Sequence, residues 1–246
     1  MQTFTRLLWP VFLLSHWLSC GFVAWVLLAQ VNFAYPLAYS ALNIEQHIAQ
    51  YGPQNRYRED FANTDKPQRM ALFSQINHAI HQNPEDLKNI TFTPHSGATQ
   101  TLLRHDEVLH LTDVAHLIDG VYRLGISAII ALLLSAAVLY RARSSLPRPK
   151  PVALGVCGSL GFMVASVLII GPKKVFYALH TWVFPPEHPW FFYYQDSLMT
   201  TLMKAPDLFG FIAALLLTLW LLLWGVTLFY ITRYWPRRNT NLVNEQ

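Results

Sequence analysis

The chain contains little charge and almost no cysteine. Only 13% of its 246 residues are charged, and its two cysteines, Cys20 and Cys157, both fall inside long apolar runs. The sequence therefore supports neither a disulfide framework nor a zinc–cysteine site. It also lacks a G-x-S-x-G pentapeptide, so a serine nucleophile of the α/β-hydrolase type is not indicated. No basic face with interleaved aromatic residues is present, and we expect no nucleic-acid partner.

What the sequence does contain is four long apolar runs, over residues 7–29, 121–140, 152–171 and 208–232. Each is close to the roughly 20 residues that cross the hydrocarbon core of a bilayer. The last run carries no charge through FGFIAALLLTLWLLLWGVTLFYIT, whereas a long helix of a water-soluble protein would show a polar stripe. We therefore predict an all-α membrane protein with four transmembrane helices, forming one integral membrane domain over residues 1–246.

Positive charge near the ends of the runs predicts the orientation, because cytoplasmic loops carry an excess of Lys and Arg. These charges are Arg6 near the N-terminus, Arg141, Arg143, Arg148 and Lys150 between the second and third runs, and Arg233, Arg237 and Arg238 in the tail. We predict that both termini are cytoplasmic and that residues 30–119 and 172–207 lie outside. The first run continues past Cys20 and is too long for a cleaved signal peptide. This layout is typical of a bacterial cytoplasmic (inner) membrane protein.

The outer segment between the first two spans is predicted to be a mostly helical insertion. We expect a short helix over 40–50, a helix over 67–82, a loop or short hairpin over 83–100, and helical structure over 101–120 that runs into the second span. In the second of these helices, four apolar side chains recur on one face: Leu72, Phe73, Ile76 and Ile80.

Two histidines are candidate site residues. His110, in LHLTDV, precedes the second span, and His180, in ALHTWVF, follows the third, so both are predicted at the outer face. A titratable side chain near hydrocarbon costs free energy unless it is paired or faces a cavity. Asp113 lies three residues after His110 on the same helical face and could orient the imidazole. Acidic residues are also common in the first turn of a helix, where they are exposed to solvent and have no catalytic role. This alternative explains Asp106 and Glu107 well.

The outer loop over 172–207 is rich in aromatic residues, among them Trp182, Phe184 and Trp190. Trp and Tyr favour the membrane interface, so the loop is either a surface anchor or the lipid-binding floor of an active site. Lys173 is placed to meet a lipid phosphate. Asp196 follows the aromatic run and needs a partner near the interface, for which the candidates are His180, Lys173, Lys174 or a ligand amine.

The other outer histidines are interpreted as structural. His188, flanked by prolines, is interpreted as a loop residue. His105 and His116 point away from the face of His110 and are predicted to be structural or exposed. The remaining four are predicted to face solvent: His47, His78, His81 and His95. A metal site built from His110, His180 and Asp113 is not favoured, because the histidine spacing along the helix does not match the i, i+4 ligand pattern.

Three short motifs resemble those of the bacterial lipoprotein intramolecular transacylase family. They are formed by His110, Leu111, Asp113 and Val114; by Leu179, His180, Val183 and Phe184; and by Trp190, Phe192, Asp196 and Leu198. The four-span layout is similar too, so the resemblance covers most of the chain. The family usually has Phe before the second histidine and two Phe after it, where this chain has Leu179 and Val183-Phe184. The outer insertion of this chain over 50–100 is longer than the corresponding segment of the Gram-positive family members.

The resemblance implies transfer of the sn-2 acyl chain of a diacylglyceryl-cysteine lipoprotein onto the α-amino group of that cysteine. It implies His110, oriented by Asp113, as base and His180 as oxyanion donor or acid, with the reverse assignment open. No metal or organic cofactor is expected. The partners are the lipoprotein and membrane lipid, and the predicted substrate contacts are Asp196, Trp190, Phe184, Trp182 and Lys173. Nothing in the sequence indicates an oligomeric state.

Two other functions suit the same residues. One is a different interfacial enzyme, such as a phospholipid or glycolipid acyltransferase or a lipase. The other is a non-catalytic envelope scaffold or sensor whose outer segment binds a partner.

Overall fold

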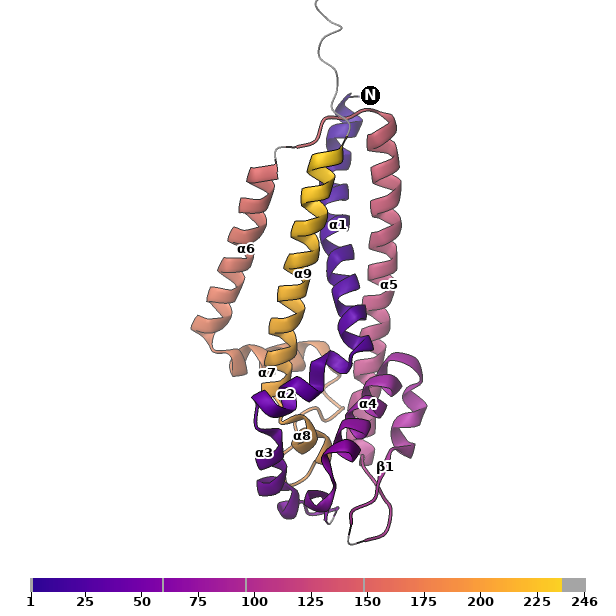
Figure 1. Cartoon of the computed structure of the whole chain (residues 1–246), viewed down its shortest axis with the longest axis vertical. Helices are drawn as coiled ribbons and strands as arrows, with labels where there is room; N and C mark the ends of the chain where they lie inside the picture. The colour runs from indigo at the N-terminus through magenta and orange to yellow at the C-terminus, as the bar shows by residue number, and fades with distance from the viewer. Residues whose placement is uncertain (1, 59, 96, 148, 236–246) are drawn as a thin grey trace, which may run out of the picture. The chain divides into compact units, whose positions relative to one another are not determined.

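The computed structural model describes residues 2–58, 60–95, 97–147 and 149–235 (Figure 1). Arg148, Arg237 and Arg238, which contribute to the predicted orientation, lie outside the described residues, and so does the side chain of Arg6.

The described residues are mostly helical. The α-helices are α1 (Gln2–Gln30), α2 (Tyr35–Ala41), α3 (Ile44–Tyr51), α4 (Lys66–Gln82), α5 (His105–Arg141), α6 (Pro149–Ile170), α7 (Pro172–Val183), α8 (Leu198–Met203) and α9 (Asp207–Tyr234). Short 3₁₀ turns cover Asn32–Ala34, Gly52–Gln54, Phe61–Asn63 and Pro84–Asn89. Strands β1 (Thr91–Phe92) and β2 (Gln100–Thr101) form one antiparallel pair, with Thr91 opposite Thr101.

The chain divides into two compact units. The first, here the apolar unit, contains Met1–Ala24, Tyr122–Pro172 and Leu217–Gln246. The second, the insertion unit, contains Trp25–Val121 and Lys173–Leu216. The prediction of a single membrane domain remains a prediction.

In the described part of the chain, four helices are long and apolar enough to cross a membrane, over Leu7–Gln30, His105–Arg141, Lys150–Ile170 and Asp207–Tyr234. This confirms the four predicted spans. In the most apolar window of α6 no residue is buried by protein. Such a helix, apolar on all sides and uncovered, is suited to lipid rather than water.

Inside the apolar unit, α1 and α9 are joined by polar as well as aromatic contacts. His16 Nε2 lies 2.7 Å from Thr227 Oγ1, and Trp220 Nε1 donates to the carbonyl of Trp17 at 2.8 Å. Gly21 leaves room for the Trp220 ring, which a Cβ at this position would meet at 2.5 Å. His16 is therefore a contact between helices.

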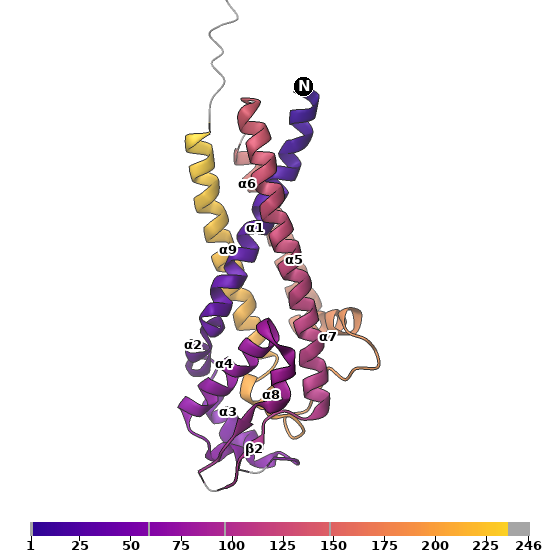
Figure 2. The ribbon, with the colours of Figure 1, turned by 90° about the vertical axis from the view of Figure 1, so that its right-hand side faces the viewer.

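The insertion unit has an apolar core of its own. Figure 2 shows the ribbon of the short helices α2, α3, α4 and α8, which contribute residues to this core. Helix α4 confirms the helix predicted over 67–82, and it begins where the Asp65 side chain accepts a hydrogen bond from Gln68 N at 2.8 Å. Leu72, Phe73 and Ile76 are buried in the core as predicted. The β1–β2 pair agrees with the short hairpin, one of the two alternatives predicted over 83–100, and it extends to Thr101, where helical structure was predicted. The helix predicted over 40–50 is instead divided into α2 and α3, because Asn43 adopts a left-handed conformation (φ 52°).

Two histidines that were predicted to face solvent do not. His81 on α4 is half-buried, and its ring centroid lies 5.9 Å from that of Trp25 and 6.0 Å from that of Phe33. His47 on α3, predicted to face solvent, is buried in the insertion unit. Its ring centroid lies 4.7 Å from that of Tyr51 and 4.4 Å from that of Tyr194. Tyr194 is far away in sequence, so a local pattern could not reveal this contact.

Candidate active site

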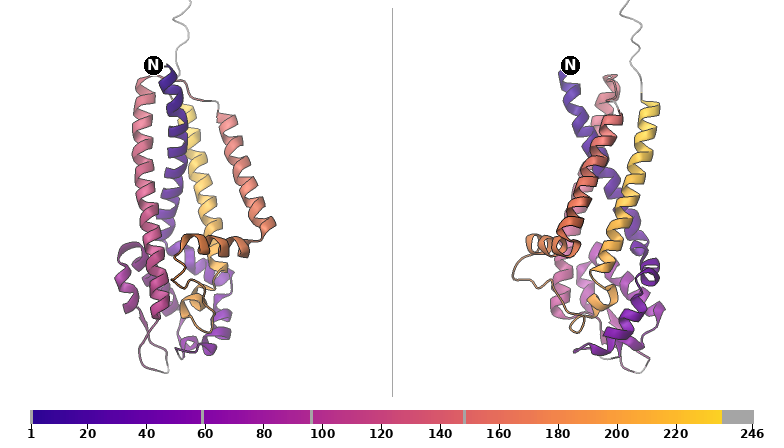
Figure 3. Two further views of the ribbon diagram at one scale, coloured as in Figure 1. Left: turned by 180° about the vertical axis from the view of Figure 1, so that it is seen from behind. Right: turned by 90° about the vertical axis from the view of Figure 1, so that its left-hand side faces the viewer.

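The insertion unit contains a cavity of about 510 Å³ with a mainly apolar lining. Side chains from the end of α1 and the turn after it, from α4, α5, α7 and α8, and from the start of α9 line it, together with part of the loop that joins α7 to α8. Figure 3 shows the backbone of this loop from two further sides. The volume lies in the range of small-molecule sites. Among the few polar residues in the lining are His110, His180 and Thr200. The cavity thus offers space for an apolar group and a small number of polar side chains.

His110 and His180, predicted from the sequence as the catalytic pair, line this same cavity. Their ring centroids lie 6.2 Å apart. His110, in the second turn of α5, is only 8% exposed, and its ring lies 4.9 Å from that of Phe184. At this separation a single ester group could lie within reach of both imidazoles.

The surroundings of His180 determine which of its nitrogens carries the proton. Its Nδ1 lies 2.8 Å from the carbonyl oxygen of Phe176, one turn earlier on α7. A carbonyl oxygen only accepts hydrogen bonds, so Nδ1 is the donor and Nε2 of the neutral ring keeps its lone pair. Burial lowers the pKa of His180, an effect that the hydrogen bond to Phe176 partly opposes. His180 is therefore a neutral imidazole with a free basic nitrogen near neutral pH.

The tautomer of His110 follows from a different argument. Its Nδ1 is buried and has no hydrogen-bond partner among the described residues. An unpaired buried N–H is rarer in proteins than an under-used acceptor, which favours Nδ1 as the bare acceptor and Nε2 as the N–H. The two rings then carry complementary groups, a base on His180 and a donor on His110.

Comparison with known proteins identifies the family of the chain. A family model described as lipoprotein intramolecular transacylase Lit matches residues 11–205. The chain belongs to this family. It is therefore an intramolecular transacylase, a membrane-integral acyltransferase. The resemblance seen in the sequence motifs is confirmed.

Solved structures give the same fold. A structure of the lipoprotein intramolecular transacylase Lit from Bacillus cereus is 15% identical, with a TM-score of 0.67, and the match covers 95% of this chain and 96% of that one. A variant of that protein with a histidine replaced by arginine is 16% identical at the same TM-score, with 95% and 92% covered. A search of curated proteins finds no significant match.

The hydrogen bond predicted between Asp113 and His110 is not the contact that Asp113 makes in the structure. The Asp113 carboxylate oxygen Oδ2 lies 2.6 Å from Nδ1 of His188, whereas His110 Nδ1 has no partner within the described part of the chain. His188 does lie in a loop, as predicted, but the sequence analysis missed its pairing. The two residues are 75 positions apart, and no local signal connects them.

The predicted substrate contacts separate into two groups. Phe184 and Trp190 lie beside the imidazoles, with ring centroids 5.3 and 5.0 Å from that of His180. Trp182 is 83% exposed, and Lys173 at the start of α7 is also exposed. Neither of these two is among the described residues that line the cavity.

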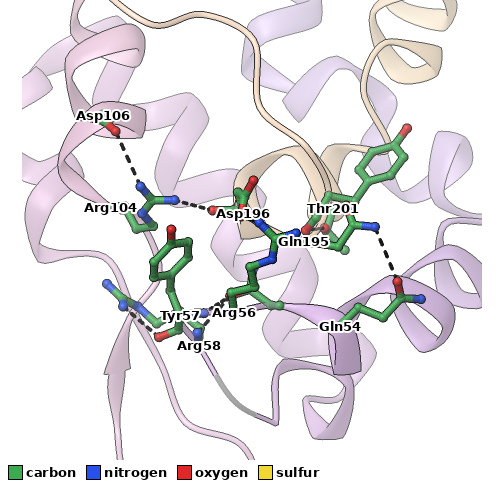
Figure 4. A network of polar contacts seen from close by, with 11 residues as sticks. Gln54, Arg56, Tyr57, Arg58, Arg104, Asp106, Gln195, Asp196 and Thr201 are labelled. Atoms are coloured by element: carbon green, nitrogen blue, oxygen red, sulfur yellow. Dashed lines mark hydrogen bonds and ion pairs between the residues drawn. The ribbon is translucent and has the colours of Figure 1, made fainter.

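Asp196 forms an ion pair within the protein, but its partner is Arg56 and not one of the predicted partners. Its Oδ1 accepts from Arg56 Nη1 at 3.2 Å, and its backbone oxygen accepts from Arg104 Nη1 at 2.8 Å (Figure 4). Arg104 also stacks on Tyr57, 3.9 Å from the ring centroid. The residues after α3 fold back onto the α7–α8 loop, and Arg56 N donates to the carbonyl of Gln195. Asp196 therefore belongs to this polar network.

Glu107 is a further residue whose role the sequence analysis missed. Interpreted as a solvated acid at a helix start, it is only 1% exposed. Its Oε1 accepts from Ser197 Oγ at 2.5 Å and from Met199 N at 3.2 Å, and its Oε2 accepts from Arg104 N at 2.7 Å. Glu107 thereby joins the start of α5, one turn before His110, to the start of α8.

Proposed function

We propose that this transacylase moves the sn-2 acyl chain of a diacylglyceryl-cysteine lipoprotein onto the α-amino group of the same cysteine. The ester C–O bond to the glyceryl oxygen breaks, an amide C–N bond forms, and the product is an N-acyl, S-lyso lipoprotein. The observation that carries the proposal is the pair of imidazoles 6.2 Å apart in the lining of one apolar cavity. Because donor and acceptor belong to one molecule, proximity contributes much of the rate.

In the proposed mechanism His180 is the base. Its Nε2 takes the proton that the neutral α-amine releases as the nitrogen attacks the ester carbonyl, and returns this proton to the departing glyceryl oxygen. His110 donates from Nε2 to the oxyanion of the tetrahedral intermediate. This is the reverse of the assignment favoured from the sequence. It is supported by the hydrogen bond from His180 Nδ1 to the Phe176 carbonyl.

The cavity would hold the acyl chain, with Phe184 and Trp190 beside the reacting ester. Trp182 and Lys173 are better suited to the membrane surface, where an exposed indole and an ammonium meet lipid headgroups. Asp196, satisfied by Arg56, is left out of the substrate contacts.

We place the protein in the bacterial cytoplasmic membrane with both termini in the cytoplasm and the active site on the outer face. Among the described residues, Arg141 at the end of α5, Arg143 in the turn that follows and Arg233 at the end of α9 support this orientation.

Glutamine substitutions test the two roles separately. The amide of Gln is not a base at neutral pH, so His180→Gln should lower the rate by roughly 10²- to 10⁴-fold. His110→Gln keeps an N–H donor at a similar position, so its loss should be smaller, about tenfold. The measurement is mass spectrometry of lipoproteins in a strain without its own N-acylating enzyme, and kinetics on a synthetic diacylglyceryl lipopeptide.

The exposed His116 on the same helix provides the control, and His116→Gln should behave as wild type. A well-inserted wild-type protein that leaves lipoproteins in the diacyl form, or that alters bulk phospholipids instead, would rule out the proposed reaction. Equal losses in the two glutamine variants would rule out the division of roles.

A further inference from the structure

The loop over residues 184–197, here called the strap, joins α7 to α8 and supplies aromatic rings to the active site. Phe184 lies 4.9 Å from the His110 ring and 5.3 Å from the His180 ring, measured between centroids. Trp190 lies 5.0 Å from His180. The strap contains no helix or strand along its described length. Its path must therefore be held by contacts with other elements.

At its C-terminal end the strap is held by several contacts. Arg104 donates to the carbonyl of Asp196, and Ser197 donates to Glu107, so this end is attached to the start of α5. These contacts lie beyond Trp190 and Phe184 in the chain. They do not hold the part of the strap that faces the imidazoles.

Between Phe184 and Trp190, one side-chain hydrogen bond joins the strap to α5 among the described residues. It is the 2.6 Å contact between His188 Nδ1 and Asp113 Oδ2. The Asp113 side chain is 14% exposed and that of His188 is 32% exposed, so water screens the contact only partly. Asp113 lies one turn after His110 on the same helix face, so the attachment point is next to the catalytic imidazole.

The sequence around His188 allows this contact to determine the position of the rings. Pro185, Pro186 and Pro189 flank it, and proline restricts φ to about −65°. His188 N also donates to the carbonyl of Pro185 at 3.1 Å, which forms a turn. In such a stiff segment, fixing His188 also fixes Trp190 two residues later.

We propose that Asp113 and His188 form a latch that positions the strap, and that both are positioning residues for acyl transfer. By holding Phe184 and Trp190 against the imidazole pair, the latch keeps His110 and His180 in their reactive orientations. Neither residue touches the substrate. The inference rests on the proposed function, because it assigns the two histidines to the reaction.

Kinetics of the full-length purified enzyme on a synthetic diacylglyceryl lipopeptide test the latch. His188→Ala and Asp113→Ala should each lower kcat by roughly ten- to a hundredfold, because small displacements of catalytic groups have effects of this size. KM should change much less, since α4, α5, α8 and α9 still line most of the cavity. The double variant should be no slower than either single variant, because both remove the same contact.

Conservative variants separate positioning from general stability. The amide N–H of His188→Asn takes the place of Nδ1–H and should restore kcat to within about twofold of wild type. His188→Gln places its amide one methylene farther away and should not. His116→Ala, an exposed histidine on α5, is the matched control for loss of an imidazole.

The outcomes distinguish failure of the latch from failure of the proposed function. Wild-type kcat in His188→Ala, additive losses in the double variant, or an Asn variant as slow as the Ala variant would each overturn the latch while the reaction stands. If the wild-type enzyme forms no lyso lipopeptide, or if His180→Gln is fully active, the proposed function itself fails.

Discussion

Glu107 is the residue of the insertion unit whose charge is most completely enclosed. The residue is 1% exposed, and its carboxylate accepts hydrogen bonds from one hydroxyl and two backbone N–H groups. A buried carboxylate is tolerated only when donors of this kind satisfy it. The arrangement stabilises two helix starts at once, because the first N–H groups of α5 and α8 have no partner within their own helices.

Replacement of Glu107 by glutamine should therefore destabilise the fold. The NH₂ group of the Gln amide cannot accept a hydrogen bond, so it would leave unpaired a donor that is now bonded to a Glu107 carboxylate oxygen. We therefore expect Glu107→Gln to lower the free energy of unfolding by about 1–3 kcal/mol. Thermal unfolding of the detergent-solubilised protein provides the measurement. The neighbouring Asp106, with a half-exposed side chain and a 3.5 Å ion pair to Arg104, is the control. Asp106→Asn should change stability by less than about 0.5 kcal/mol. Equal stability of both variants would contradict this account.

At the scale of elements, α3 packs a titratable residue into the core of the insertion unit. The His47 ring packs against the rings of Tyr51 and Tyr194. Burial, with a smaller contribution from the charge of Lys204, lowers the pKa of His47 to about 4, and the charge of Asp207 opposes this. The unfolded chain, with a pKa near 6.5, binds a proton at His47 more readily than the folded protein does.

The stability of the insertion unit should consequently depend on pH. Between pH 6.5 and 4 the unfolded state binds more protons at His47 than the folded state, so stability falls as the pH is lowered through this window and is complete above it. His47→Phe removes the titrating group and should reduce the difference in Tm between pH 7.5 and pH 4.5. His78→Phe, at an exposed position of α4, should leave the wild-type difference unchanged. An unaltered pH dependence in His47→Phe would exclude His47 as its source.

At the scale of the whole molecule, the two units differ in whether their large apolar side chains are buried or exposed. The insertion unit buries its apolar side chains in a common core, as a water-soluble domain does. The apolar unit leaves large apolar side chains such as Leu134, Phe162 and Ile169 exposed. In water this exposure would lead to aggregation, whereas in a bilayer it is the expected surface.

The proposed orientation can be measured by cysteine labelling in intact cells. In a background with Cys20 and Cys157 replaced by alanine, a membrane-impermeant maleimide should label Lys88→Cys in the insertion unit. It should not label Ser145→Cys, in the loop between α5 and α6, until the membrane is opened. Both positions are exposed, so accessibility to solvent within the protein is matched. The reverse labelling pattern would place the active site in the cytoplasm.

Much of the fold is determined by the sequence alone. The four spans follow from runs of apolar residues long enough to cross a bilayer, and α4 follows from apolar residues at helical spacing, since such local patterns specify which faces are buried. The two site histidines were found because a titratable group at the edge of an apolar run is costly without a function.

The tertiary structure alone decided which polar groups meet. It paired Asp113 with His188 rather than His110, joined Asp196 to Arg56 across 140 positions of the chain, and buried His47 under Tyr194. It also fixed the proton of His180 on Nδ1 through the Phe176 carbonyl. The physical reason is that local periodicity encodes burial, whereas the partner of a hydrogen bond depends on which distant segments the folded chain brings within about 3 Å.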